Sequence, residues 1–105
     1  MFKGIPTSFW LYGQNIAVNF DPTLSDVTDC VGESHYRRNE IVLQPNTEGV
    51  ERLVSRVEQT FLHELVHYIF YMLGEDDLRK NEKLIDGVAS LLHQAINTAE
   101  YEEDI

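Results

Sequence analysis

The stretch "TFLHELVHYIFYML", residues 60–73, is apolar almost throughout and yet contains His63, Glu64 and His67. On an α-helix, residues four apart project from one face, one turn apart, so both imidazoles can reach the same point. Glu64 is too close in sequence to His63 to share that position comfortably, but it can reach a water molecule there. This His-Glu-x-x-His spacing predicts a metal ion held by the two histidines.

Zinc is the metal that suits these ligands best. Zn²⁺ takes imidazole nitrogens at about 2.0–2.1 Å, and its catalytic sites combine three protein ligands with an open position for water. The metal lowers the pKa of that water to about 7, and a neighbouring carboxylate can take its proton. A pair of core histidines is the competing interpretation, but two imidazoles and a carboxylate are costly to bury without a partner. We therefore expect His63 and His67 as ligands and Glu64 as the general base.

The stretch "NEKLID", residues 81–86, is expected to supply the third ligand. Glu82 and Asp86 are four apart and flank the apolar stripe of a second predicted helix. Glu82 is the predicted ligand, because one carboxylate and two neutral imidazoles leave the metal electrophilic. Asp86 then suits a supporting position, where it accepts the outer N–H of a ligand histidine and fixes its tautomer. Asp86 is also the main rival of Glu82 for the ligand position.

The order "HELVH" followed by "NEKLID" resembles the gluzincin metallopeptidases, whose third ligand comes from an Asn-Glu-x-x-x-Asp stretch on the next helix. The small size, the strands before the motif and "DGVASLLHQAI" after it also resemble short bacteriophage-type metallopeptidases related to the ImmA/IrrE group. The resemblance implies zinc bound by His63, His67 and Glu82, with Glu64 as base and Asp86 supporting a ligand histidine. Large gluzincins also have a second domain that builds substrate pockets and stabilises the oxyanion, and this sequence shows no such domain.

Four other side chains could stabilise the oxyanion of a tetrahedral intermediate: His35, Tyr36, Tyr68 and Tyr71. Each is also a common packing or surface residue, so the sequence does not choose between them. His93 follows Glu82 by three turns, which is too far along a helix to reach the same metal. We expect it at the surface or rim.

Short β-branched and aromatic runs fill the first half of the chain. "SFWLY" and "IAVNF", separated by residues 13–15, predict one hairpin, and "CVGESHY" and "EIVLQ" around "RRN" predict another. In the second half, apolar residues recur at helical spacing over residues 50–73 and 84–99. The first helix should be capped by Asn46 or Thr47, with Glu48 in its first turn, and should stop at Gly74. Asp77 is the expected cap of the second helix.

This layout predicts an α+β fold: a compact zincin-like domain with a small N-terminal antiparallel sheet followed by two long helices, the active-site helix and the third-ligand helix. The 105 residues suggest one domain that spans residues 1–105. The predicted helices should fold back on each other across a short turn, which brings Glu82 towards the two histidines.

Composition excludes several classes of partner. The formal net charge is −10, which repels nucleic acids and anionic membranes. No segment approaches the roughly 20 apolar residues of a membrane span. The single cysteine, Cys30, cannot form an internal disulfide, which fits a reducing cytoplasm. We expect a cytoplasmic protein of a bacterium or a phage-infected cell.

The function that follows is zinc-dependent hydrolysis of a peptide bond in a protein or peptide substrate, which would lie extended along an edge strand. The alternative is a non-catalytic, metal-stabilised interaction or regulatory protein, of phage origin, that retains the zincin fold. An acidic decoy for a DNA-binding protein is a third possibility. Metal content separates the first two from the third, and activity that depends on Glu64 separates the first from the second.

Overall fold

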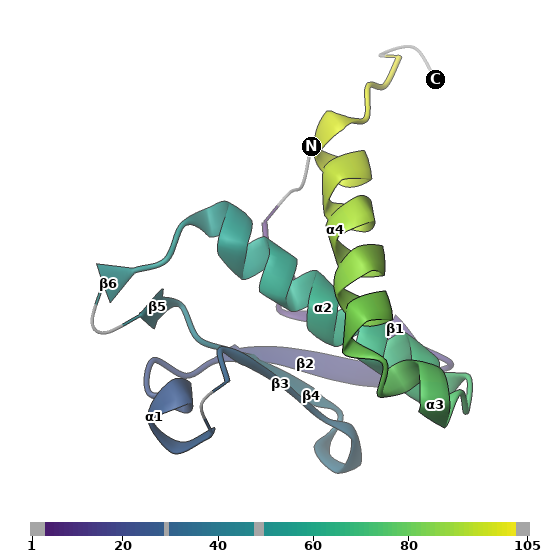
Figure 1. Cartoon of the computed structure of the whole chain (residues 1–105), viewed down its shortest axis with the longest axis horizontal. Helices are drawn as coiled ribbons and strands as arrows, with labels where there is room; N and C mark the ends of the chain where they lie inside the picture. Colours follow the sequence, from purple (N-terminus) through teal and green to yellow (C-terminus); the bar gives the residue numbers. More distant parts are fainter. Residues whose placement is uncertain (1–3, 29, 48–49, 103–105) are drawn as a thin grey trace.

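A computed structural model describes residues 4–28, 30–47 and 50–102. The chain forms a four-stranded sheet whose one face is covered by a long helix, and a second long helix crosses the first (Figure 1). The elements in chain order are β1 Ser8–Leu11, β2 Gln14–Phe20, α1 Leu24–Thr28, β3 Gly32–His35, a 3-10 turn Tyr36–Arg38, β4 Glu40–Leu43, β5 Asn46–Thr47, β6 Val50–Glu51, α2 Val54–Met72, α3 Asp76–Arg79 and α4 Glu82–Thr98. The prediction of an α+β fold with a small N-terminal sheet and two long helices is confirmed.

Both predicted hairpins are present. Strands β1 and β2 pair antiparallel with Leu11 opposite Gln14, so only Tyr12 and Gly13 form the loop. Both loop residues have positive φ angles, 46° and 75°. A two-residue hairpin loop favours this conformation, since it matches the right-handed twist of the strands. In the second hairpin β3 pairs antiparallel with β4, and Asn39 closes the turn at a φ of 51°.

The sheet is mixed, so its predicted fully antiparallel pairing is wrong at one position. The strand order is β1-β2-β4-β3, and β2 pairs with β4 in parallel. The apolar run Ile41, Val42 and Leu43 is buried throughout, which suits β4 to a central position. The more polar β3 is therefore left at the edge of the sheet. Among the residues that the structure describes, no strand pairs with its outer row of backbone N–H and C=O groups.

The hydrophobic core lies between the sheet and α2, and α4 closes one side of it. Residues from β2 and β4 pack against one face of α2, together with two residues of α4. The buried cluster comprises Ile16, Val18, Ile41, Leu43, Val57, Phe61, Leu62, Val66, Tyr68, Ile85 and Ala89. The opposite, more polar face of α2 is the one that carries the two histidines of the motif.

Helix α2 begins later than predicted and ends where predicted. Asn46 and Thr47 are not helix caps but form β5, which pairs with β6 in a small ribbon, and Glu48 lies outside the described residues. Pairing of β5 with β6 satisfies backbone groups that a helix would otherwise bond internally. At the other end Gly74 has a φ of 72°, Gly74 N–H donates to Tyr71 and Glu75 N–H donates to Phe70. This is the Schellman arrangement that a glycine stop favours.

The second predicted helix is divided in two. A single turn, α3, precedes α4, and the side chain of Asn81 caps α4 by accepting a hydrogen bond of 3.1 Å from Leu84 N–H. The prediction of Asp77 as cap is wrong, because Asp77 lies inside α3. The break at Asn81 makes Glu82 the first residue of α4. Its side chain therefore projects from the end of α4 that lies against α2.

Candidate metal centre

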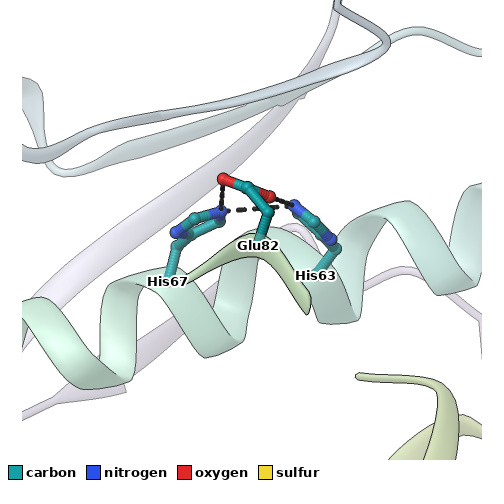
Figure 2. A group of neighbouring side chains, drawn as sticks. All are labelled: His63, His67 and Glu82. Atoms are coloured by element: carbon teal, nitrogen blue, oxygen red, sulfur yellow. Dashed lines mark hydrogen bonds and ion pairs between the residues drawn. The ribbon is translucent and has the colours of Figure 1, made fainter. Parts of the chain in front are cut away.

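His63 and His67 lie one turn apart on α2, and both rings point to the same side (Figure 2). Their Nε2 atoms are 3.2 Å apart. Both side chains are largely buried, with 23% and 13% of their surface exposed. Two unprotonated Nε2 atoms at this separation direct their lone pairs at one point, which is unfavourable unless a proton or a cation lies there.

Glu82 places its carboxylate at that same point from α4. One carboxylate oxygen is 3.2 Å from His63 Nε2 and the other is 3.2 Å from His67 Nε2. The three residues form a group whose ligand atoms lie within 4.8 Å of one another (Figure 2). Glu82 remains 64% exposed, so the group is open to solvent on the α4 side.

The spacing of these atoms can be compared with a metal site. Ligands at about 2.0–2.1 Å from a tetrahedral zinc ion are about 3.3 Å apart, close to the 3.2 Å between the two Nε2 atoms. Glu82 contacts the two nitrogens through different oxygens, so its exposed side chain needs to turn slightly to bring one oxygen towards both. The imidazole and carboxylate donors are also of the type that zinc takes in catalytic sites. His63, His67 and Glu82 can therefore hold a metal ion while leaving a fourth position open.

Asp86 lies behind the group and contacts one of the histidines. Its Oδ1 atom is 2.7 Å from His63 Nδ1, the contact that its predicted supporting role requires. An Nδ1–H that donates to Asp86 leaves His63 Nε2 unprotonated and facing the other two residues. The structure thus brings Glu82, and not Asp86, among the candidate ligand atoms, although both project from the first turns of α4.

Glu64 lies beside the group without joining it. Its side chain is nearly buried, and one oxygen is 4.0 Å from His63 Nε2. The other oxygen accepts a hydrogen bond of 2.9 Å from the Ser34 hydroxyl on β3. Burial raises the pKa of the Glu64 carboxyl, while the Ser34 hydrogen bond and the two imidazoles act in the opposite direction. A carboxyl with a raised pKa is well suited to accept a proton.

Gly32 lets β3 approach α2 closely enough for this contact. A Cβ atom at Gly32 would lie 2.6 Å from Thr60 Cγ2 and 3.2 Å from Glu64 Cγ. Neither Gly32 nor Ser34 was singled out from the sequence. Both lie about 30 residues before the motif, and no local pattern links an edge strand to one particular turn of a distant helix.

A groove of about 780 Å³ runs between β3 and the two long helices and contains the group. It is lined by residues 30–34 on one side and by residues of α2 and α4 on the other. An adjoining hollow extends it past Ser34 and His67 to Tyr36, Arg79 and Lys80. The candidate metal ligands thus lie in a long depression beside the unpaired edge of β3.

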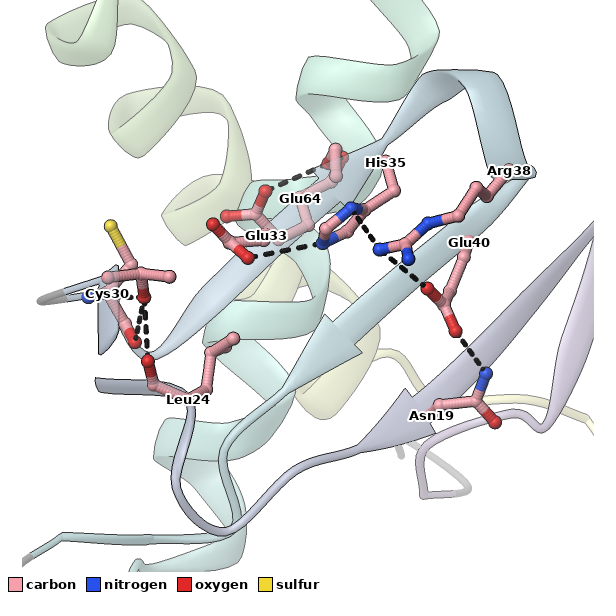
Figure 3. A network of polar contacts seen from close by, with 10 residues as sticks. Asn19, Leu24, Cys30, Glu33, His35, Arg38, Glu40 and Glu64 are labelled. Carbon is pink, nitrogen blue, oxygen red and sulfur yellow. Dashed lines mark hydrogen bonds and ion pairs between the residues drawn. The ribbon is translucent and has the colours of Figure 1, made fainter. Parts of the chain in front are cut away.

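Of the four side chains considered for stabilising the oxyanion, Tyr36 lines the hollow that adjoins the groove, whereas the other three make contacts elsewhere. Tyr68 is fully buried and its hydroxyl donates to the backbone of His35. Tyr71 stacks on Tyr36 with ring centroids 4.2 Å apart. His35 belongs to a polar network along β3 and β4, in which it contacts Glu33 and Arg38 (Figure 3).

His93 does not lie free at the surface, so that expectation is wrong. Its Nε2 atom is 3.0 Å from an oxygen of Glu58, a buried carboxylate on α2. The pair fastens the middle of α4 to α2. The sequence signal was available, since Glu58 interrupts the apolar side of α2, but only packing of α4 identifies its partner.

Comparison with known families is informative over most of the chain. A family described as SprT-like matches residues 7–83, from β1 to the start of α4. The matched range includes His63, Glu64, His67 and Glu82 and excludes Asp86. No curated protein and no solved structure matches. Within the described residues, no helix has the length and apolar character needed to cross a membrane.

Proposed function

Because this chain belongs to the SprT-like family, whose domains are related to zincin-type metallopeptidases, we propose that it is a zinc-dependent peptidase. The observation that carries the proposal is the group of three donors whose candidate ligand atoms lie within 4.8 Å of one another, with a nearly buried carboxylate beside it. His63, His67 and Glu82 are the proposed ligands. The glutamate in this set is the feature that supports the finer gluzincin-type assignment, while a relation to the phage-type ImmA/IrrE group remains a proposal from the motif.

Zinc, when bound here, would polarise the scissile carbonyl and acidify the attacking water. Glu64 is the residue that takes the proton from this water and passes it to the leaving amine. The Ser34 hydroxyl holds one oxygen of Glu64 at 2.9 Å, which leaves the oxygen nearer His63 to receive the proton. Asp86 orients His63 by accepting its Nδ1–H.

The proposed substrate is a peptide segment that lies extended along β3. This edge strand lines the groove, so its outer backbone groups can pair with a bound peptide beside Glu64 and the histidines. Backbone pairing would provide affinity without regard to sequence. It would also carry a scissile carbonyl past the proposed zinc position.

Tyr36 and Arg79 are proposed to stabilise the developing oxyanion. Both line the hollow that continues the groove past Glu64 and His67. The guanidinium of Arg79 lies over the Tyr36 ring, 5.4 Å from its centroid. Its buried Nε atom has no hydrogen-bond partner in the part of the chain that the structure describes. A hydroxyl and a cation at this end of the groove are suitable donors for a negative oxygen.

The experiment that tests the function compares zinc-loaded wild type with Glu64→Gln. The variant keeps its size and can still accept the Ser34 hydrogen bond, but it cannot accept the proton. Glu64→Gln is used to capture bound proteins, and wild type is then tested for cleavage of each one. Cleavage by wild type with a loss of about 10²–10⁴-fold in Glu64→Gln is the expected result. If no captured protein is cut, the non-catalytic, metal-stabilised interaction protein becomes the better description.

A further inference from the structure

Two arginines, Arg52 and Arg56, line one end of the groove, at the N-terminal end of α2. They also line a smaller hollow that adjoins it, together with Val31, Val50 and Glu51. Positive charge is scarce in this molecule, which has 8 Lys and Arg residues against 18 Asp and Glu residues. The position of two arginines side by side in the groove therefore needs an explanation.

Neither arginine forms an ion pair with a carboxylate in the described part of the chain. Arg52 donates to neutral oxygens instead, those of Gln44 C=O at 2.8 Å and Thr60 Oγ1 at 2.7 Å. The side chain of Arg56 is exposed and has no partner among the described residues. Burial and, secondly, the nearby charge of Arg56 lower the pKa of Arg52. The two cations are thus close enough to repel each other.

Other arginines of the chain show that carboxylates are available as partners. Arg38 pairs with Glu40, and Arg79 pairs with Asp76. Glu51 lies in the same hollow as Arg52 and Arg56 without pairing with either. Two close cations that have no carboxylate partner among the described residues are the arrangement expected where the carboxylate of a bound ligand balances their charge.

The distance along the groove locates this end relative to the metal group. Arg56 precedes His63 by seven residues on α2, about 10 Å at 1.5 Å per residue. An extended peptide covers that distance in about three residues. We propose that Arg56, held beside Arg52, forms a subsite that binds an acidic side chain of the substrate about three residues from the scissile bond.

This inference rests on the proposed peptide groove and extends it to substrate class. A peptide carboxylate fits better than a nucleic acid, because Glu33, Glu82 and Asp86 line the same groove and the net charge is −10. A phosphate backbone would have to lie along these carboxylates, whereas a peptide needs to bring only one negative charge to the arginines.

The test is a binding measurement that does not require turnover. The protein is zinc-loaded Glu64→Gln. The probes are fluorescein-labelled, C-terminally amidated nonapeptides of Thr, Val and Ala. Each peptide carries one Glu at a different position, and each is compared with the same peptide carrying Gln at that position. The expected result is one position, about three residues from the cleavage site seen with wild type, where Glu binds at least about fivefold more tightly than Gln. The preference should weaken as salt is raised.

A charge exchange at Arg56 identifies the residue responsible. Arg56→Glu should lose the preference for Glu and gain one for Lys at the same position. Arg37→Glu makes the same change at an exposed arginine away from the groove and should keep the preference for Glu. Arg52 is left intact, since it holds Gln44 and Thr60.

The outcomes separate this inference from the proposed function. Acid-dependent binding without cleavage by wild type supports the subsite and contradicts the peptidase. Cleavage with no difference between Glu and Gln peptides overturns the subsite and leaves the peptidase standing. Equal binding of both peptides also overturns the subsite. So does displacement of the bound peptide by a single-stranded oligonucleotide of equal length.

Discussion

Zinc should raise the melting temperature of metal-free protein through the group of His63, His67 and Glu82. The two Nε2 atoms already have the spacing of zinc ligands, and the exposed Glu82 carboxylate contacts both, so binding requires a small turn of Glu82 and little rearrangement of α2 and α4. A ligand that binds only the folded state stabilises it by about 2.7 kcal/mol at 100 times its dissociation constant. For a domain of this size, each kcal/mol is worth about 4–8 °C, so the expected shift is about 10–20 °C.

The assay is calorimetry of chelator-treated protein with stepwise zinc, with magnesium as the metal control, because Mg²⁺ prefers oxygen ligands. His63→Ala should abolish the shift, since His63 makes two of the three contacts and also holds Asp86. His35→Ala is the matched control and should keep it. A shift below about 2 °C for wild type, or an undiminished shift for His63→Ala, would refute the metal-site reasoning.

Three further predictions concern single substitutions. Asp86→Asn removes the carboxylate that accepts His63 Nδ1–H at 2.7 Å, and should weaken zinc binding by about 10–100-fold in a competition titration while leaving the metal-free melting temperature nearly unchanged. Burial raises the pKa of Glu64 in the folded state above its ordinary value of 4.5. Protonated Glu64 therefore stabilises the folded state below pH 4.5, and this stabilisation is lost as the pH rises through the folded-state pKa. Metal-free Glu64→Gln should therefore melt higher than wild type at pH 7, and equal melting at pH 7 would contradict this sign. His93→Ala takes away the 3.0 Å contact to buried Glu58 and should cost about 1–3 kcal/mol in urea unfolding, equally with and without zinc; a zinc-dependent cost would count against a purely structural pair.

The motif could be recognised from the sequence because its geometry is local. Residues four apart on an α-helix lie on the same face, one turn apart. His63 and His67 therefore had to lie together once the segment was helical. The same locality explains the first hairpin and the glycine stop at Gly74, where a short sequence sets the backbone conformation.

The remaining features depend on contacts between distant segments. The sequence favoured Glu82 as ligand with Asp86 as its rival. The break at Asn81 places Glu82 among the candidate ligand atoms and Asp86 behind His63. Insertion of β4 between β2 and β3 put Ser34 on an edge strand within reach of Glu64. Helical and strand periodicity fix which residues share a face of one element. How two elements pack is decided by burial summed over the whole core, and so only the tertiary structure determines which polar groups meet in the groove.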